Sequence, residues 1–357
     1  MPWMTLTRPD DWHLHLRDGE MLRRVLPDTA RQFGRAIVMP NLPTPVTTVE
    51  LARQYHERIL QALPSGSTFQ PLMTLYLTEE TTAAEMIAAK ESGLIQAVKW
   101  YPAGATTHSQ QGVRDVSRCG SALAALEAQG LPLLVHAEST DSGVDIFDRE
   151  AVFLERELAP VLKRYPHLRV VVEHVTTEQA VQFVRSARPR VGATITAHHL
   201  LLNRNALFDG GLRPHHYCRP VLKRERHRLA LVSAATSGDA RFFLGTDSAP
   251  HLRRDKESSC GCAGVYTAHA AIELYAEVFE QAGALHRLEA FASFHGPDFY
   301  GLPRNTDTIT LEKSAWQVAN SIGIGNDELI PFRAGERMPW KLVDVATTDA
   351  PSSKTKA

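Results

Sequence analysis

The chain has 357 residues, with 39 Lys and Arg against 40 Asp and Glu, and a net charge of −1 at pH 7. A near-neutral chain without any run of five or more like charges lacks the electrostatic footprint of a nucleic-acid-binding protein. No stretch approaches the roughly 18 consecutive apolar residues of a membrane span, and the amino end lacks the pattern of a secretory signal. We therefore expect a soluble cytoplasmic protein that acts on a small molecule, with no nucleic-acid or membrane partner.

Histidine is the compositional oddity, because 16 residues are roughly twice the ordinary usage. The four cysteines are too few for a disulfide framework in a chain of this length, so we expect reduced thiols. The histidines are therefore the first candidates for catalytic or metal-binding residues.

Short apolar runs recur along the chain, and each ends in a polar residue or a turn. There are eight, at 3–7 (running on towards 15), 35–39, 70–77, 95–100, 131–135, 168–172, 191–197 and 241–245. Segments with helical spacing of apolar residues lie between or after them, at 49–63, 79–92, 121–129, 150–164, 178–187, 225–235 and 267–282. Parallel strands need crossover helices, and eight strands close around a core that side chains just fill. The pattern predicts an α/β fold, a TIM-like (β/α)8 barrel.

The domain organisation follows from the same pattern. The length allows about two average domains or one barrel, and no linker rich in Pro, Gly and Ser divides the chain. An open, doubly wound sheet is the alternative, but it usually carries a glycine-rich phosphate loop after its first strand, and no such motif follows any run. We predict one domain over residues 1–345, including a C-terminal extension that starts near 301, and a disordered tail over residues 346–357.

Polar residues at the carboxyl ends of the predicted strands carry the chemistry, because that end of such a barrel forms the active face. Each has an ordinary structural explanation when taken alone, such as a satisfied core histidine or a helix cap. Their recurrence on one rim of the barrel favours a shared functional site. Imidazoles with one carboxylate are suitable ligands for Zn²⁺. The set comprises His13 and His15 after the first run, Lys99 after the fourth, His136 after the fifth, His174 after the sixth and Asp247 after the eighth.

Lys99 does not fit a simple metal site, because an ammonium group beside divalent cations is repelled. A strand-end lysine that reaches solvent is one explanation. The other is a lysine whose pKa is lowered until its neutral amine adds carbon dioxide, which gives a carbamate with two oxygens able to bridge two metals.

Several motifs in this order resemble the amidohydrolase superfamily and, within it, the homodimeric bacterial dihydroorotases. The similarity covers about 13–301, most of the chain. The motifs are HLHLRDG from His13, VMPN at 38–41, VKWYPAGATTHS at 98–109, HHYCRPVLK at 215–223, GTDSAPH ending at His251 and KESSCGCAG at 256–264.

The resemblance implies reversible interconversion of N-carbamoyl-L-aspartate and L-dihydroorotate in de novo pyrimidine biosynthesis, by a homodimer with two Zn²⁺ per subunit. His13, His15 and Asp247 would hold the more buried zinc. His136 and His174 would hold the more exposed zinc, and N6-carboxylated Lys99 would bridge the two. A metal-bridging hydroxide would attack the ring amide, with Asp247 as general acid and base.

An anionic substrate is expected on independent grounds. Two zinc ions with a carbamate, a carboxylate and a hydroxide keep a charge of about +1. Arg17 shares the strand face of His13 and His15, while Trp12, Leu14 and Leu16 are expected on the other face. Its guanidinium can bind a carboxylate through two parallel hydrogen bonds.

The resemblance implies further substrate contacts around Arg17. Asn41 and His251 would help to hold the substrate carboxylate, and the metal ligands His15 and His136 would also lie against the substrate. The backbone at Arg219 and Ala263 would contact the ring. Thr106 and Thr107 would lie on a lid loop that closes over the substrate.

Two other functions remain open at this stage. A hydantoinase-like cyclic amide hydrolase would use the same metal core, although a neutral hydantoin does not need the carboxylate pocket of Arg17, Asn41 and His251. An inactive barrel that acts as a scaffold is the second alternative, although no expected ligand is missing from the sequence.

Overall fold

The computed structural model describes residues 2–346. Its central feature is a sheet of eight parallel strands in the order β2-β3-β4-β5-β6-β7-β8-β9. Main-chain contacts join the two outer strands, because Asp247 N donates to His13 O (2.8 Å) and His15 N donates to Ser248 O (3.0 Å). The strands are β2 (Asp11–Leu14), β3 (Arg35–Val38), β4 (Gln70–Tyr76), β5 (Ile95–Trp100), β6 (Leu133–Val135), β7 (Val170–Val172), β8 (Val191–Ile195) and β9 (Phe242–Leu244). The predicted (β/α)8 barrel is confirmed.

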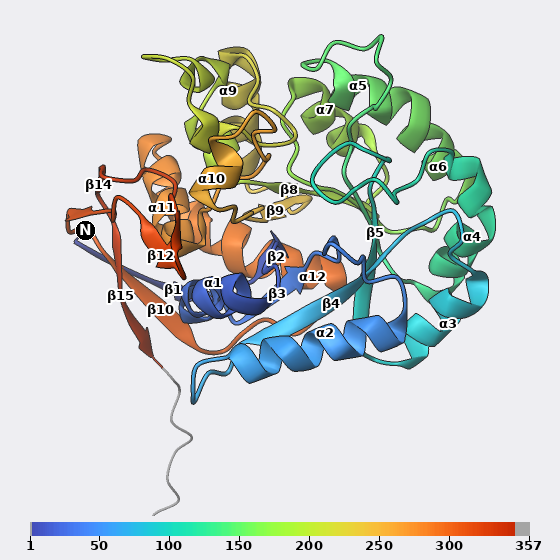
Figure 1. Cartoon of the computed structure of the whole chain (residues 1–357), viewed down its shortest axis with the longest axis horizontal. Coiled ribbons are helices and arrows are strands. Elements are labelled where there is room, and N and C mark those ends of the chain that lie inside the picture. Colours follow the sequence, from blue (N-terminus) through green and yellow to red (C-terminus); the bar gives the residue numbers. More distant parts are fainter. Residues whose placement is uncertain (1, 347–357) are drawn as a thin grey trace, which may run out of the picture.

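Helices surround the strands, as Figure 1 shows. Threonine caps set the start of several of them, because a hydroxyl that accepts a free backbone N–H stabilises the first turn; Thr48, Thr82 and Thr177 cap α2, α3 and α7. The helices are α1 (Gly19–Gln32), α2 (Val49–Ala62), α3 (Ala83–Glu91), α4 (Gly120–Gln129), α5 (Arg149–Phe153), α6 (Ala159–Arg164), α7 (Glu178–Ser186), α8 (Ala197–Leu201), α9 (Glu225–Ala235), α10 (Arg253–Lys256), α11 (Ala271–Gln281) and α12 (His295–Tyr300).

The first predicted strand divides into two. Residues Trp3–Thr7 form β1, which pairs with the C-terminal extension, and the barrel begins only at Asp11. Pro9 lies between the two strands, and proline cannot donate a ladder hydrogen bond. A single continuous strand from residue 3 towards 15 was therefore wrong.

The C-terminal extension is a set of short antiparallel strands beside the barrel. One three-stranded sheet has the order β1-β10-β15, and two small antiparallel two-stranded sheets are β11-β14 and β12-β13. Its strands are β10 (Thr308–Glu312), β11 (Trp316–Gln317), β12 (Ile322–Ile324), β13 (Asp327–Leu329), β14 (Arg337–Met338) and β15 (Lys341–Ala346). Of the predicted tail, only Ala346 falls within the described residues, and it ends β15.

The barrel interior and its outer face are packed by different residues. Trp12 lies in the interior cluster with Ile37, Leu134 and Phe243, and its ring stacks on Tyr300 of α12 at a centroid distance of 4.4 Å. Leu14 and Leu16 belong instead to the large cluster between strands and helices. The expectation that Trp12 shares their face was wrong, because the pairing of β2 shifts register between Asp11 and Leu14.

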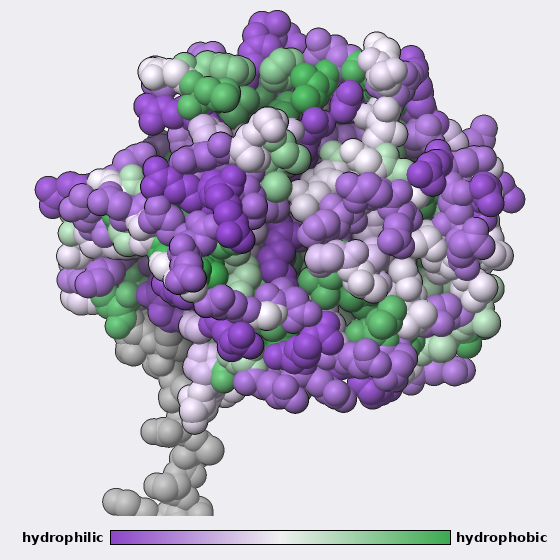
Figure 2. Space-filling model, in the orientation of Figure 1, coloured by the Kyte–Doolittle hydropathy of each residue, from purple (hydrophilic) through white to green (hydrophobic). Residues whose placement is uncertain are grey.

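Hydropathy varies across the surface of the molecule. The face in Figure 2 is largely hydrophilic, with hydrophobic residues gathered mainly along its upper edge. Within residues 2–346, no helix is long and apolar enough to cross a membrane.

Candidate metal centre and active site

The predicted metal ligands converge at the carboxyl ends of five barrel strands. His13 belongs to β2 and Lys99 to β5, whereas His136, His174 and Asp247 stand one, two and three residues after the ends of β6, β7 and β9. All are buried, with exposed fractions of 8% or less. A pocket with about 310 Å³ of empty volume opens onto them, lined by His13, His15, Arg17, Asn41, Tyr101, Thr106, Thr107, His136, His174, Arg219, Asp247, Ala249, Ala263 and Gly264.

His13, His15 and Asp247 form one potential metal site. Nε2 of His15 lies 3.1 Å from Asp247 Oδ1, and Nε2 of His13 lies 3.3 Å from the same oxygen. One ligand atom from each of the three falls within 4.8 Å of the others, which is the spacing that a single ion requires. His13 forms a second such group with Glu173 and His174.

The second ring nitrogens of His15 and His136 have their own partners. Nδ1 of His15 lies 2.8 Å from Asn41 Oδ1, and Nε2 of His136 lies 2.8 Å from Glu138 Oε2. Such partners fix the tautomer and the orientation of a metal-binding imidazole. They leave Nε2 of His15 and Nδ1 of His136 as the nitrogens that can bind a metal.

The donor set fits zinc. Four buried imidazoles and a carboxylate are ligands that Zn²⁺ favours, and Nδ1 of His174 is buried without a hydrogen-bond partner. Nζ of Lys99 is fully buried in contact with the Glu173 carboxylate and lies 4.9 Å from the centre of the Tyr101 ring. A buried lysine at this position agrees with a neutral or carboxylated amine and excludes the explanation that it reaches solvent.

Burial sets the protonation of these groups. It lowers the pKa of His15 to about 3 and lowers the pKa of His174 well below its usual range, so both rings are neutral and able to bind metal. Burial also lowers the pKa of Lys99 well below its usual range, which favours the amine that can add carbon dioxide. Burial opposes ionisation of Asp247, but His13 and His15 beside it hold its pKa well below the usual value.

Backbone strain is concentrated at this site. Arg17, His174 and Asp247 have φ values of 60°, 41° and 45°, in the left-handed region that side-chain-bearing residues rarely adopt. His108 on the neighbouring loop, at 54°, is a fourth residue of this kind. Strain of this kind persists where the surrounding structure holds it, often at functional sites.

Arg17 lines the pocket and contacts His251. Its Nη2 lies 3.0 Å from Nε2 of His251, and its Nε donates to Pro250 O (3.2 Å). Its Nη1 is buried without a hydrogen-bond partner. Burial lowers the pKa of His251 well below its usual range, so a neutral ring accepts the hydrogen bond from Arg17. The guanidinium is therefore fixed on one side and has an unsatisfied donor on the other.

The loop with the two threonines lies over the pocket. Thr107 Oγ1 donates to Ala263 O (3.4 Å), and Asn41 Nδ2 donates to Thr107 O (2.9 Å). Thr106 is held by its backbone, because its N donates to Ser109 Oγ (2.9 Å). The side chain of Arg219 turns towards Tyr217, with 2.9 Å between Nε and Oη, which agrees with a contact through its backbone.

Three buried residues next to the ligands were not predicted. Oε1 of Glu173 lies 3.0 Å from Nδ1 of His13, Glu138 is hydrogen-bonded to His136, and Tyr101 lines the pocket. The sequence does carry a signal for Glu173, since a carboxylate that directly follows three valines of β7 has to be buried. Glu138 stands two residues after His136, and a role was predicted from the sequence only for His136.

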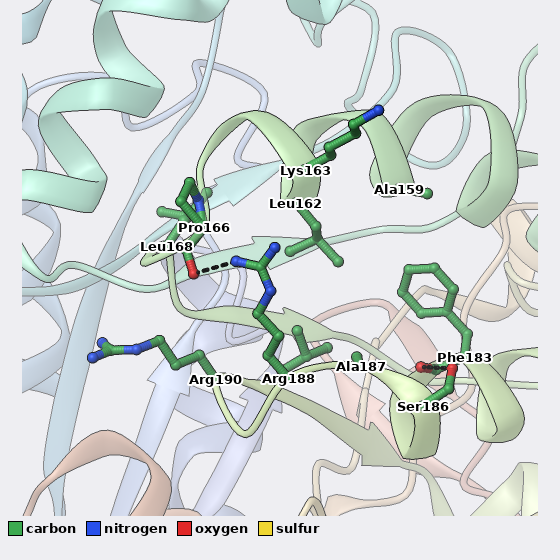
Figure 3. A pocket seen from close by; sticks show the side chains of 11 residues that line it. Ala159, Leu162, Lys163, Pro166, Leu168, Phe183, Ser186, Ala187, Arg188 and Arg190 are labelled. Atoms are coloured by element: carbon green, nitrogen blue, oxygen red, sulfur yellow. Dashed lines mark hydrogen bonds between the residues drawn. The ribbon is translucent and has the colours of Figure 1, made fainter.

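A larger groove lies at the opposite end of the barrel, between α6 and α7 (Figure 3). Leu162 and Phe183 line it, with Lys163, Arg188 and Arg190 as its basic residues. None of the predicted site residues belongs to it, and the amino ends of barrel strands serve stability rather than catalysis. The pocket at the carboxyl ends is therefore the candidate active site.

A barrel with these side chains at the carboxyl ends of its strands defines an enzyme of the amidohydrolase class. The amidohydrolase family model matches residues 10–327. A dihydroorotase of Methylobacillus flagellatus is 66% identical over 341 residues, which are 96% of this chain and 99% of that protein. The chain therefore belongs to the amidohydrolase family and, within it, to the dihydroorotases.

Solved structures give the same relationship. The dihydroorotase of Campylobacter jejuni is 35% identical with a TM-score of 0.87, and the match covers 95% of this chain and 97% of that one. The dihydroorotase of Saccharomyces cerevisiae, solved in complex with 5-fluoroorotic acid, is 33% identical with a TM-score of 0.89, covering 96% and 99%.

Proposed function

We propose that this chain interconverts N-carbamoyl-L-aspartate and L-dihydroorotate, with uptake or loss of water, in de novo pyrimidine biosynthesis. The observation that carries the proposal is the position of Arg17, a carboxylate-binding side chain fixed by His251 at the edge of a cluster of metal ligands. Both compounds are carboxylates with an amide or acyl carbon a short distance away. The yeast relative was solved with another carboxylic acid of this ring type.

The cofactor in this proposal is a pair of zinc ions. His13, His15 and Asp247 would hold one and His136 and His174 the other, with Lys99, carboxylated at Nζ, between them. When bound, two such ions make water more acidic and polarise the carbonyl carbon that it attacks.

Arg17 would bind the substrate carboxylate, using the Nη1 hydrogens that have no partner among residues 2–346. His251 accepts from the same guanidinium and keeps it from turning away. Asn41 would complete the carboxylate pocket, and the backbone at Arg219 and Ala263 would meet the polar edge of the ring. A ring held on these sides has its amide carbon directed at the ligand cluster.

Asp247 would move the proton. Its Oδ1 lies between Nε2 of His13 and Nε2 of His15, at the floor of the pocket. In hydrolysis this carboxylate would take the proton of the attacking water and give it to the departing ring nitrogen. In condensation the protonated carboxyl would assist the loss of water from the attacked carboxyl group.

Thr106 and Thr107 would bind the acyclic compound and exclude water from it. The loop is anchored to both sides of the pocket through Asn41 and Ala263. Exclusion of water favours the condensation in particular, because that direction releases a water molecule.

We further propose a single domain over residues 1–345, a homodimer and a cytoplasmic location.

A dihydroorotate absorbance assay on wild type and Lys99→Ala, with zinc measured on the same samples, tests the proposal. The wild type is expected to hold two zinc ions per chain and to turn over dihydroorotate. The variant is expected to lose zinc and at least 10³-fold of its activity, because it removes the ligand shared by both ions. Full activity in the variant would contradict the bridging carbamate.

Two other outcomes separate the alternatives. A wild-type chain that hydrolyses hydantoins but not dihydroorotate would support the hydantoinase-like function. A chain with no turnover when zinc is supplied would support the scaffold.

A further inference from the structure

Glu173 is a buried carboxylate that the proposed mechanism does not use. It lies between β7 and His174 with 0% of its side chain exposed. A carboxylate removed from water at this depth is costly unless both of its oxygens find donors. The residues around Glu173 therefore indicate its role.

Both oxygens of Glu173 face candidate metal ligands. Oε1 lies 3.0 Å from Nδ1 of His13, and Oε2 is in contact with Nζ of Lys99. His13 would bind the more buried ion and Lys99 would bridge the pair. One side chain thus contacts ligands that serve both ions.

The contact with His13 determines which ring nitrogen is free. Nδ1 lies 3.0 Å from the Glu173 carboxylate, and a hydrogen on Nδ1 that is directed at this carboxylate would leave the lone pair on Nε2. That nitrogen points to Asp247, 3.3 Å from Oδ1, where the first ion would sit. Without the carboxylate the neutral ring could place its hydrogen on either nitrogen, and only one of these tautomers can bind the ion.

The contact with Lys99 determines where its nitrogen lies. A carbamate nitrogen keeps one hydrogen, and a hydrogen bond from this N–H to Glu173 would turn the two carbamate oxygens away from Glu173 and towards the other ligands. Tyr101 bounds the same nitrogen with its ring face. His15 and His136 have separate partners in Asn41 and Glu138, whereas the two oxygens of Glu173 lie against two different ligands, His13 and Lys99.

We propose that Glu173 is a positioning residue for the metal centre, which fixes the tautomer of His13 and the nitrogen of Lys99 with one carboxylate. This inference rests on the proposed function, because it presupposes the two ions and the carbamate. Glu173 itself touches neither the substrate nor the reacting atoms in this account.

The test compares Glu173→Gln with Glu150→Gln. A glutamine has nearly the same shape, but its single carbonyl oxygen cannot accept from His13 and Lys99 together, and its NH2 group faces a donor. Glu150 is an equally buried carboxylate that accepts from Thr176 N and Thr177 Oγ1 and contacts no metal ligand, so its variant reports the cost of losing a buried charge.

The readouts are zinc affinity by competition with a chromophoric chelator and the carbamate signal of Lys99 by ¹³C NMR after equilibration with ¹³C-bicarbonate. Glu173→Gln is expected to bind zinc about 10 to 100-fold more weakly and to lose most of the carbamate signal. Glu150→Gln is expected to keep both at the wild-type level. Unchanged zinc affinity and carbamate in Glu173→Gln would overturn the inference.

Two results keep the inference separate from the proposed function and from misfolding. A wild-type chain with neither zinc nor carbamate would refute the proposed function, whereas an intact wild type with an unaffected Glu173→Gln would refute this inference alone. If Glu173→Gln does not fold, ¹⁵N NMR of the His13 ring in the wild type decides. A hydrogen on Nδ1 supports the inference, and a hydrogen on Nε2 overturns it.

Discussion

Asn41 Oδ1 lies 2.8 Å from Nδ1 of His15, while Nδ2 of the same amide donates to Thr107 O at 2.9 Å. One side chain thus joins a candidate metal ligand to the loop that covers the pocket. The backbone of Asn41 adds a third link, since its carbonyl oxygen accepts from Nδ1 of His108 (3.1 Å). The position of this loop and the orientation of the His15 ring are therefore linked through Asn41.

Two substitutions at Asn41 separate these contacts. Asn41→Asp keeps an oxygen for His15 and loses the donor to Thr107, so it is expected to retain zinc while KM for dihydroorotate rises about 10-fold or more. Asn41→Ala loses both contacts and is expected to bind zinc about 10-fold more weakly as well. Zinc analysis with steady-state kinetics measures both effects. Equal loss of zinc in the two variants would show that the acceptor for His15 is not what holds the ring.

The loop predicts a directional effect. Replacing both Thr106 and Thr107 by alanine removes their hydroxyl and methyl groups and keeps the hydrogen bonds of the loop backbone to Asn41 and Ser109. Turnover of N-carbamoyl-L-aspartate is expected to fall by about 10²-fold or more at constant zinc content, because water is less well excluded and the acyclic compound less well held. Thr5→Ala, which removes a hydroxyl exposed on β1, serves as the control. Unchanged kinetics in the double variant would refute a role for the two hydroxyls.

Arg17 predicts an effect that depends on the substrate carboxylate. Arg17→Lys keeps the charge and loses the planar pair of donors, so KM for dihydroorotate is expected to rise about 10 to 100-fold. Dihydrouracil has the same ring without the carboxylate, and its slow hydrolysis is expected to change little. Comparison of the two substrates on wild type and variant is the measurement. An equal loss for both would mean that Arg17 supports the structure of the site rather than binding the carboxylate.

The barrel and the ligand positions were predictable from the sequence because both depend on local order along the chain. Buried parallel strands appear as short apolar runs, and the first polar residue after each run lies on the active face. His136, His174 and Asp247 stand within three residues of the ends of their strands, so strand position indicated them as candidates. Lys99, still inside β5, could be placed by position but needed the resemblance for its role.

What the sequence did not predict depends on contacts between distant segments. Glu173 lies against the ring of His13 on another strand, and a contact of this kind leaves no periodic pattern in the sequence. The side of β2 on which Trp12 lies depends on a register shift against the next strand. The separate strand β1 depends on pairing with β10, some 300 residues away in the chain.

His199 predicts a loss of stability in acid. Its ring is 2% exposed, with 2.9 Å between Nε2 and Pro220 O and 2.7 Å between Nδ1 and Thr196 Oγ1, and burial lowers its pKa to about 4. An unfolded histidine has a pKa near 6.5, so below that pH the unfolded chain binds a proton that the folded chain does not. The stability contributed by the neutral ring is complete above about pH 6.5 and is lost as the pH falls towards 4.

A variant isolates this contribution from that of the other buried histidines. Between pH 7.5 and 5.5, one such group lowers the free energy of unfolding by about 1 kcal/mol. His199→Gln cannot titrate in this range, so its free energy of unfolding is expected to fall by about 1 kcal/mol less than that of the wild type over the same interval. Urea unfolding of both proteins at the two pH values, at one fixed zinc concentration, gives this difference, and the constant cost of the substitution cancels. Parallel pH dependence in the two proteins would mean that the folded ring takes up its proton near the ordinary pKa, and that the buried hydrogen bonds to Pro220 and Thr196 do not hold it neutral.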